Sequence, residues 1–262
     1  MAQGRTVPAV DRAVKILNVF LDGQGPRTVP EITAHVDLPR STTYELVQTL
    51  VANNYLRAVD GYGNRFDLGI RLLELGSTFS AGIDLAEQGR VVADTIMARC
   101  NETVHIATRD GRDVIYLVKA DSPHAVRMVS GVGRRLPAHC TAVGKAMLAD
   151  LSDDELAELY RDVTDWPAMT PKTITTFDEL LDQLHTVRGR GLAYDDCESN
   201  PDVKCVAAAV RDLSGAVVAG ISISVPVHRA DHRLDDELTH HVAEGARDLS
   251  ARLGYTPRPG QA

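Results

Sequence analysis

The sequence has few cysteines, few aromatic residues and no long apolar segment. Its four cysteines lie far apart and none belongs to a CxxC pair, which argues against a disulfide framework and against a zinc ribbon. No apolar run approaches the roughly 18 residues that a membrane helix needs. The N-terminus, MAQGRTVPAV, also lacks the apolar centre of a signal peptide. We therefore expect a cytoplasmic protein with reduced thiols and no membrane partner.

Basic residues are outnumbered in this chain, with 28 Lys and Arg against 36 Asp and Glu and a net charge of -8. Residues 1–70 hold seven of each sign, so the whole negative excess falls in the remainder. Attraction to nucleic acid depends on the local charge, and the neutral first part is not repelled as the rest would be. The 262 residues exceed one typical domain. Length and charge together predict two domains with different partners.

The first part of the chain shows three segments with helical spacing. Apolar residues between Val10 and Leu21 recur at i, i+3, i+4 and i+7. Thr28 and Glu31 form a capping-box pattern at the start of a second helix, and a third helix begins at Arg40. Residues 55–68 then predict a hairpin with a glycine-rich turn. A plain three-helix bundle is the alternative, but the hairpin favours a winged helix-turn-helix that binds DNA.

The third helix is predicted to present a polar face. Thr43, Leu46, Val47 and Leu50 share its inner side, so the opposite side is free to enter a major groove. Arginines on the hairpin are expected to contact phosphates. The predicted DNA-binding residues are Arg40, Ser41, Thr42, Tyr44, Glu45, Gln48, Arg57 and Arg65.

The rest of the chain predicts an α+β domain behind a connecting helix. Residues 69–82 have too few leucines to be buried alone, and we expect this helix to pack on a partner subunit or domain. Antiparallel strands with helices segregated among them define the α+β class. Strands are expected at 103–109, 114–119, 125–129, 191–194, 206–212 and 217–226, and helices at 85–100, 142–149, 153–160, 177–188 and 235–253.

Polar residues gather around the last strands. Asp195 and Cys205 both precede the apolar run 206–210, and the later run GISISVP contains Ser222 and Ser224. Side chains alternate along a strand, so both serines point to one face while Ile221 and its apolar neighbours point to the other. Two hydroxyls on one face predict a small polar pocket. Lys145 follows a glycine, but the full phosphate-loop pattern is missing and we assign it no role.

Three kinds of chemistry remain as alternatives. Cys205 with His139 and Asp195 has the residue types of a nucleophile, a base and an orienting acid, although nothing near Cys205 looks like a nucleophile elbow. A metal site has suitable ligand types but no recognisable spacing. Asp195, Asp196 and Glu198 have the residue types of paired catalytic acids, and a charged loop explains them equally well. The metal candidates are His139, Cys140, Asp195, Cys197 and Glu198.

Five blocks in this order resemble the IclR family of bacterial transcription regulators over nearly the whole chain. They are AVDRAVKILNVF, LPRSTTYELVQTLVANNYL, FDLGIRLLELG, LPAHCTAVGKAMLA and GLAYDDCES with KCVAAAVRD and GISIS. The resemblance implies a winged helix-turn-helix DNA-binding domain at 1–68, a linker helix at 69–84 and a GAF-like effector-binding domain at 85–255. We expect 256–262 to be a disordered tail.

The resemblance also implies a mode of action. An IclR-type regulator would bind a palindromic or near-palindromic double-stranded operator as a dimer or a dimer of dimers, sense a small organic, carboxylic or aromatic acid-like effector, and control a catabolic operon, commonly as a repressor. No catalytic residue, metal or cofactor is implied. A small-molecule enzyme that uses Cys205 and carries an accessory winged helix is the alternative. The implied effector-binding positions are Gly144, Asp195, Cys205, Ser222 and Ser224.

Overall fold

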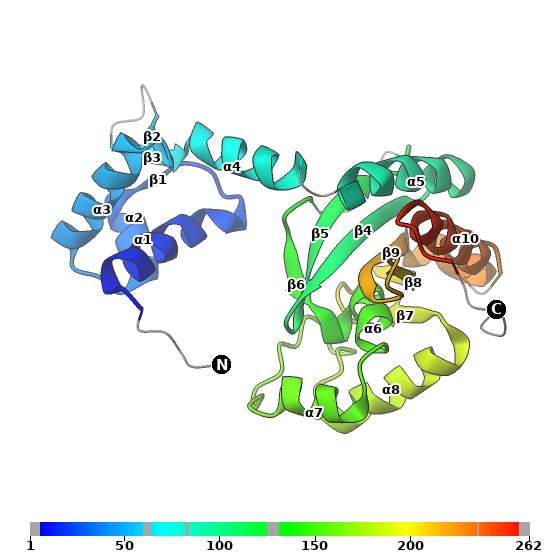
Figure 1. Ribbon diagram of the computed structural model, residues 1–262. Coiled ribbons are helices and arrows are strands. Elements are labelled where there is room, and N and C mark those ends of the chain that lie inside the picture. The colour runs from blue at the N-terminus through cyan, green and yellow to red at the C-terminus, as the bar shows by residue number, and fades with distance from the viewer. Residues whose placement is uncertain (1–5, 60–63, 82–83, 125–130, 235, 257–262) are drawn as a thin grey trace. The chain divides into compact units, whose positions relative to one another are not determined.

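The computed structural model describes residues 6–59, 64–81, 84–124, 131–234 and 236–256. The chain divides into two compact units, Met1–Ile83 and Asp84–Ala262 (Figure 1). The strand expected at 125–129 lies outside the described residues, as do the tip of the first hairpin and nearly all of the C-terminal tail. No helix among the described residues is long and apolar enough to cross a membrane.

The N-terminal unit contains the expected helices followed by a hairpin. A short 3-10 helix, η1 (Val19–Asp22), follows α1 (Pro8–Asn18), and α2 (Val29–Val36) precedes α3 (Arg40–Ala52). Strands β2 (Leu56–Ala58) and β3 (Arg65–Leu68) pair antiparallel. The predicted capping box at Thr28 is present, with both of its hydrogen bonds to Glu31. The prediction missed β1 (Arg27–Thr28), whose two residues pair with β3 and complete a sheet in the order β1-β3-β2.

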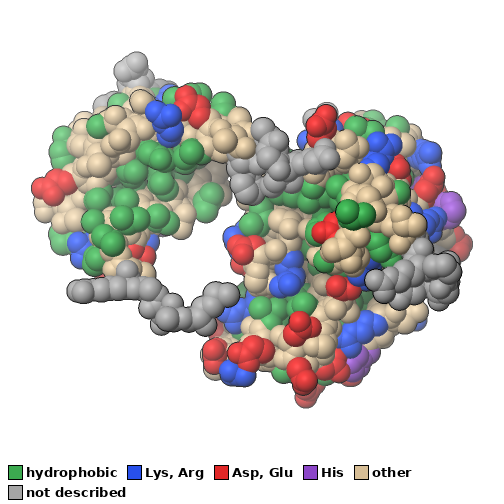
Figure 2. All heavy atoms as spheres, in the orientation of Figure 1, with side chains coloured by type: hydrophobic (Ala, Val, Ile, Leu, Met, Phe, Trp, Pro, Cys, Tyr) green, Lys and Arg blue, Asp and Glu red, His purple; other side chains and the backbone are tan. Residues whose placement is uncertain are grey.

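The helix after this sheet, α4 (Ile70–Ala81), carries apolar side chains in solvent. Ile70, Leu73 and Leu75 are each at least half exposed. The first helix adds Val10 and Val14, and Figure 2 shows hydrophobic side chains gathered on the face of the N-terminal unit turned toward the viewer. The N-terminal unit thus leaves several large apolar side chains exposed to solvent.

The C-terminal unit is built on a six-stranded antiparallel sheet in the order β6-β5-β4-β9-β8-β7. One face packs against α5 (Asp84–Cys100) and α10 (Glu237–Arg252), and the other packs against α6 (Ala142–Leu148), with α8 (Phe177–Arg190) alongside (Figure 1). Each face has its own apolar cluster. The strands are β4 (Thr103–Asp110), β5 (Asp113–Ala120), β6 (Arg135–Pro137), β7 (Ala193–Asp196), β8 (Val203–Arg211) and β9 (Val217–Pro226).

The remaining segments are short, and the expected α+β class is confirmed. They are η2 (Ala138–Cys140), α7 (Asp153–Tyr160), α9 (Val227–Ala230) and η3 (Asp231–Leu234). Ser152 caps α7 as predicted. Two strand predictions were wrong at their starts: β7 begins two residues later than Gly191, and β8 begins at Val203, before Val206. Gly191 ends α8 in the left-handed conformation and is not part of β7. Cys205 lies inside β8. Strand β6 was not predicted.

Candidate functional sites

The strand register brings four of the five predicted effector-binding residues together. Asp195 pairs with Cys205, and Cys205 pairs with Ser224, so these residues form one row across β7, β8 and β9. Ser222 lies in the adjacent row. Directly paired residues point to the same face, and here that face is covered by α6. Ile221 and Ile223 belong to the opposite cluster. The two serines therefore share a face as predicted, and both are buried.

Asp195 is bonded within its own turn. Its Oδ1 accepts the backbone N–H of Glu198 at 2.6 Å and that of Ser199 at 3.3 Å, and its Oδ2 accepts the Ser199 hydroxyl at 2.5 Å. Burial raises the pKa of Asp195 to about 6, and the hydrogen bonds from Ser199 and Glu198 oppose that shift. The carboxylate thus closes the turn between β7 and β8, where Cys197 takes a left-handed φ of 64°.

The middle of the row is a chain of buried hydrogen bonds. The Cys205 thiol donates to Ser224 Oγ at 3.2 Å, and Ser224 Oγ lies 3.4 Å from His105 Nδ1. Burial, and then the charge of Asp195, raises the pKa of Cys205 well above its usual value. Burial also lowers the pKa of His105 to about 3. Both groups are therefore neutral at pH 7, and the thiolate that nucleophilic chemistry requires is disfavoured.

An ion pair beside this row was missed by the sequence analysis. Lys145 on α6 is only 1% exposed, and its ammonium donates to Glu198 Oε1 at 2.6 Å and to Gln183 Oε1 at 2.7 Å. The pair joins α6 to the β7–β8 turn and to α8. Lys145 lies in the family block LPAHCTAVGKAMLA. Its place in that block was the sequence signal for a role. Comparison with the phosphate-loop pattern, which the sequence does not match, did not reveal this role.

Gly144 has a packing role in this structure. A Cβ at this position would lie 2.2 Å from the Ala138 carbonyl oxygen, and one at Gly220 would lie 2.5 Å from Val143 Cγ2. Both distances are shorter than real Cβ contacts, so the two glycines let α6 approach η2 and the sheet. The Gly144 N–H donates to the Thr141 hydroxyl at 3.1 Å. Gly144 is buried beside the row, and its N–H is already used.

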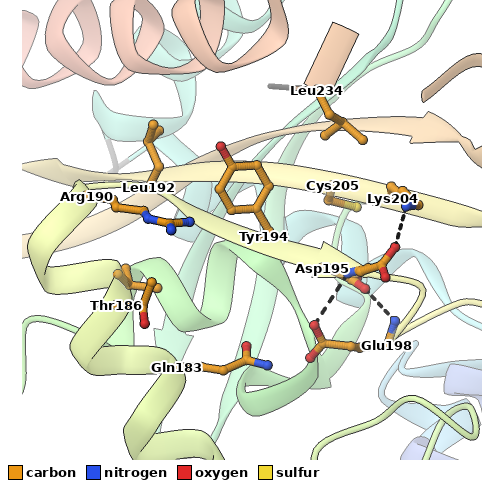
Figure 3. A pocket seen from close by; sticks show the side chains of 12 residues that line it. Gln183, Thr186, Arg190, Leu192, Tyr194, Asp195, Glu198, Lys204, Cys205 and Leu234 are labelled. Carbon is orange, nitrogen blue, oxygen red and sulfur yellow. Dashed lines mark hydrogen bonds and ion pairs between the residues drawn. The ribbon is translucent and has the colours of Figure 1, made fainter. Parts of the chain in front are cut away.

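A surface pocket reaches the row from the free edge of the sheet. It has a volume of about 470 Å³ and opens between α8, β7 and β8 (Figure 3). Asp195 and Cys205 contribute to its wall, whereas Gly144, Ser222 and Ser224 do not. The structure therefore brings two of the predicted residues to this pocket and leaves the others behind the sheet edge.

The alternative chemistries gain no support from the geometry. His139 Nε2 lies 3.2 Å from the Pro167 carbonyl oxygen, and its ring meets Trp166 edge-on. Cys205 and Asp195 are bonded to the other groups described above, so the three members of the hypothetical triad face different partners. Among the described residues, no group of three or more His, Cys, Asp or Glu side chains is arranged to hold a metal ion.

The third helix presents the surface that its periodicity predicts. Thr43, Val47 and Leu50 are buried, while Ser41, Tyr44, Glu45 and Gln48 are exposed, as is Arg40. The two hairpin arginines are engaged within the unit: Arg57 Nη2 lies 2.7 Å from Asp67 Oδ2, and Arg65 Nη1 donates to the Pro26 carbonyl at 2.8 Å. Arg65 is also 3.7 Å from Glu31. α3 and the wing together form the kind of surface that docks in a DNA groove.

An exposed recognition helix on one unit and a buried polar row in another define a DNA-binding protein with a separate second domain. Two family models match the chain. The one described as bacterial transcriptional regulator IclR, C-terminal, matches residues 78–251, and the IclR helix-turn-helix domain matches residues 9–60. The chain belongs to the IclR family and is a DNA-binding transcription regulator.

Individual relatives agree with this assignment. KdgR of Dickeya chrysanthemi, an HTH-type transcriptional regulator, is 33% identical over 231 residues, which are 88% of this chain and 75% of that protein. AllR of Salmonella paratyphi A, an HTH-type transcriptional repressor, is 30% identical over 249 residues, covering 95% of this chain and 91% of AllR. The crystal structure of Thermotoga maritima IclR is 29% identical, with a TM-score of 0.73 over 94% of this chain and 98% of that one.

Proposed function

We propose that this regulator responds to a small organic effector in the C-terminal unit and thereby controls a catabolic operon in the cytoplasm. Residues 1–68 would bind the operator, 69–84 would link, and 85–255 would sense. The observation that carries the proposal is the buried row of Asp195, Cys205 and Ser224 beneath α6. Burying polar side chains in an apolar core costs free energy. Hydrogen bonding to a ligand explains why these side chains are present there.

The chemistry of the row constrains the effector. Its groups are neutral, apart from Asp195, whose carboxylate is surrounded by donors from Ser199 and Glu198. An anion alone would be repelled by that carboxylate, so the effector needs a hydroxyl or amide donor beside any carboxyl group. Ser222, Ser224 and Cys205 offer both donors and acceptors. We therefore propose a small acid-like compound that also carries a donor, with Gly144 providing close approach of α6.

DNA binding is assigned to the outward face of α3. Gln48 has the amide geometry that pairs with adenine, and Glu45 can accept from cytosine. Ser41, Thr42, Tyr44 and Arg40 lie toward the N-terminal end of the same helix. Arg57 and Arg65 would leave their present partners for phosphates. These eight residues are the proposed operator contacts.

We also propose that the regulator acts as a homodimer or as a dimer of dimers. The exposed leucines of α4 and the exposed valines of α1 provide an apolar surface for a second copy. The balanced charge of residues 1–70 gives a single copy little non-specific affinity for DNA. Two linked copies gain affinity through effective concentration, and twofold symmetry predicts a palindromic or near-palindromic operator. AllR, a relative, is named as a repressor, and we propose repression here as well.

Catalysis is not part of this proposal. A nucleophilic cysteine needs a depressed thiol pKa, whereas burial raises that of Cys205. The competing enzyme hypothesis requires the opposite shift. A thiol titration with a small alkylating reagent separates the two, because an enzyme would show a reactive thiolate near neutral pH.

Selection of random duplexes on the full chain tests the operator proposal. The enriched sites should contain two inverted half-sites about 10 base pairs or a multiple apart. A thermal-shift screen of hydroxylated carboxylic and aromatic acids should then give a compound that stabilises the protein and changes its affinity for the selected duplex.

The serine pair tests the location of the effector. The double variant Ser222→Ala, Ser224→Ala should bind the screened compound at least tenfold more weakly, a loss of about 1.4 kcal/mol, because two buried hydroxyl partners are removed. Ser214→Ala, at the exposed tip of the same hairpin, is the matched control. Unaltered affinity in the double variant, with an unchanged far-ultraviolet spectrum, would place the effector elsewhere.

A further inference from the structure

Another pocket of the C-terminal unit lies between the turn that joins β4 to β5 and the segment that follows α7. Its volume is about 540 Å³. The turn contributes Arg112 and Asp113, α7 contributes its last residue, Tyr160, and the segment after it contributes residues 162–167. None of the five residues of the proposed effector site is among the described residues that line this pocket. The pocket is therefore built from a different part of the unit.

Aromatic contacts hold the inner part of this pocket together. The rings of Tyr160 and Trp166 are stacked, with centroids 4.9 Å apart and planes 5° apart. The ring of His139 meets that of Trp166 at 81°, with centroids 5.0 Å apart. Tyr160 and His139 are buried, whereas Trp166 is half-buried. The inner part of the pocket thus offers a preformed aromatic surface to the ring of a ligand.

Tyr160 contributes a buried hydroxyl without a hydrogen-bond partner. The residue is 5% exposed, and its Oη has no partner within the described residues. Burial raises the pKa of Tyr160, and the nearby charges of Arg112 and Arg109 oppose that shift more strongly than Asp113 adds to it. The hydroxyl is therefore a donor that lies in a positive environment. A ligand carboxylate is the acceptor that suits both properties.

Arg112 adds a free cation beside this hydroxyl. It is exposed, and across the described ranges its side chain forms no ion pair or hydrogen bond. It can therefore turn toward a ligand without breaking a contact. The neighbouring Asp113 is already paired, since Arg135 Nη1 lies 3.1 Å from its Oδ2. A carboxylate that accepts from Arg112 with one oxygen and from the Tyr160 hydroxyl with the other would satisfy both groups.

The segment after α7 adds negative charge that has no partner. Asp162 and Asp165 line the pocket and are exposed, and neither side chain forms an ion pair or hydrogen bond in the part of the chain that the structure describes. A ligand with only a carboxylate would meet two unpaired carboxylates and one unpaired guanidinium. An ammonium on the same ligand offsets that repulsion, because it donates hydrogen bonds and carries the opposite charge.

The depth of these groups fixes the shape of the ligand. Arg112, Asp162 and Asp165 are exposed at the rim, whereas Tyr160 and Trp166 lie deeper. The two charged groups of the ligand therefore belong at one end and its apolar part at the other. We propose that this pocket binds a free α-amino acid with an aromatic side chain. The carboxylate contacts Arg112 and the Tyr160 hydroxyl, the ammonium contacts the two aspartates, and the ring lies against Trp166.

Calorimetry at pH 7.5 with three probes tests the proposal on the full chain. L-Phenylalanine carries both charged groups, 2-phenylethylamine lacks the carboxylate, and 3-phenylpropanoate lacks the ammonium. We expect L-phenylalanine to bind at least tenfold more tightly than either of the other two probes. Equal affinity of all three probes, or no binding of L-phenylalanine, would overturn the proposal.

Two variants test the carboxylate contacts. Arg112→Ala should bring the affinity of L-phenylalanine down to that of 2-phenylethylamine, while Arg247→Ala, at an exposed arginine on α10, should keep the tenfold difference. Tyr160→Phe preserves the ring that stacks on Trp166 and removes only the hydroxyl. It should weaken binding of L-phenylalanine about fivefold and leave that of 2-phenylethylamine unchanged. Unchanged binding of L-phenylalanine in either variant of the pocket would contradict the site.

The two aspartates test the ammonium contact. The double variant Asp162→Asn, Asp165→Asn should bring the affinity of L-phenylalanine down to that of 3-phenylpropanoate, because the partners of the ammonium lose their charge. Asp94→Asn, at an exposed position on α5, is the matched control and should leave all three affinities unchanged. A preserved tenfold preference for L-phenylalanine over 3-phenylpropanoate in the double variant would contradict the site.

The serine double variant separates this pocket from the proposed effector site. Ser222→Ala with Ser224→Ala should bind L-phenylalanine within threefold of the unsubstituted protein, because neither serine lines the pocket. A loss of tenfold or more in that variant would place the amino acid in the buried row and would overturn the second site, whatever the outcome for the proposed effector.

Discussion

The recognition helix and the buried row are both polar, but they satisfy their polar groups in opposite ways. Gln48 and Glu45 on α3 are exposed, and in the described part of the chain their side chains have no hydrogen-bond partner. Asp195 and Ser224 are buried and bonded to neighbouring groups. When the exposed face of α3 binds DNA, its side chains give up only hydrogen bonds to water. The buried row must exchange protein hydrogen bonds for ligand ones, so its ligand has to match them in number and geometry.

The largest effect should come from breaking the ion pair beside the row. Lys145→Met leaves the Glu198 carboxylate buried without its cation and should lower the free energy of unfolding of the C-terminal unit by about 3–5 kcal/mol. Urea unfolding followed by fluorescence measures this directly, since the sequence has one tryptophan and it lies in that unit at position 166.

The double variant Lys145→Met, Glu198→Met is its control. Removing both charges should recover most of the loss, because the penalty comes from the unpaired charge and not from the missing bond. Equal destabilisation by the single and the double variants would mean that packing of the lysine stem, not charge, dominates there.

The next effect concerns pH and the buried carboxylate. Burial raises the pKa of Asp195 from 3.8 to about 6, so the folded state holds the proton more tightly than the unfolded state. That contribution to stability is complete below pH 3.8 and is lost as the pH rises through 6. Asp195→Asn removes the loss. Its stability relative to the unsubstituted protein should therefore increase between pH 4 and pH 7 by about 3 kcal/mol.

Asp196, the next residue, is the matched control of opposite sign. Hydrogen bonds from Lys204 and Lys172 lower its pKa. Asp196→Asn should therefore become less stable, relative to the unsubstituted protein, as the pH rises from 3 to 5. If the relative stability of both asparagine variants changed with pH in the same direction, burial would not raise the pKa of Asp195.

On the exposed face, the expected effect is smaller and specific to sequence. Gln48→Ala should lose discrimination at one base pair of the operator by about 1–3 kcal/mol, because a bidentate amide contact is removed. Fluorescence anisotropy with operator duplexes substituted at single positions measures it. Gln24→Ala, an exposed glutamine before β1, should preserve discrimination at all positions. A uniform weakening by Gln48→Ala would contradict base readout.

The smallest effect is expected from the wing. Arg65→Ala should weaken binding to all duplexes about equally and flatten the dependence of log affinity on log salt by about one, as for loss of one phosphate contact. Arg57→Ala should behave similarly. Arg99→Ala removes a comparable arginine-carboxylate pair in the C-terminal unit and should leave the slope unchanged. If Arg65→Ala lost as much base discrimination as Gln48→Ala, the assignment of base recognition to Gln48 and of phosphate contact to Arg65 would be contradicted.

The two regions also differ in how far the sequence predicted them. The buried and exposed sides of α3 follow from a repeat of 3.6 residues, and Thr43 and Gln48 lie where that repeat places them. The shared face of Ser222 and Ser224 follows from a repeat of two. Both are local properties, and local periodicity is readable along one segment.

Other parts depend on how distant segments meet. The row of Asp195, Cys205 and Ser224 required the register of three strands, which no single segment encodes. The pairing of Lys145 with Glu198 joins residues 53 positions apart. Strand β6 has only three residues, too few for a pattern. The family resemblance pointed to Gly144, whereas the reason for that glycine, its approach to Ala138, needed coordinates.

The close seating of α6 limits how this regulator can evolve. Gly144 and Gly220 leave no space for even one added carbon between α6 and its surroundings. A lineage that comes to respond to a different compound therefore gains little by altering either glycine, since any side chain there would push the helix away. New specificity has to arise from substitutions along the strands and in the turn after β7. The helix would stay constant across such descendants while the residues beneath it diverge.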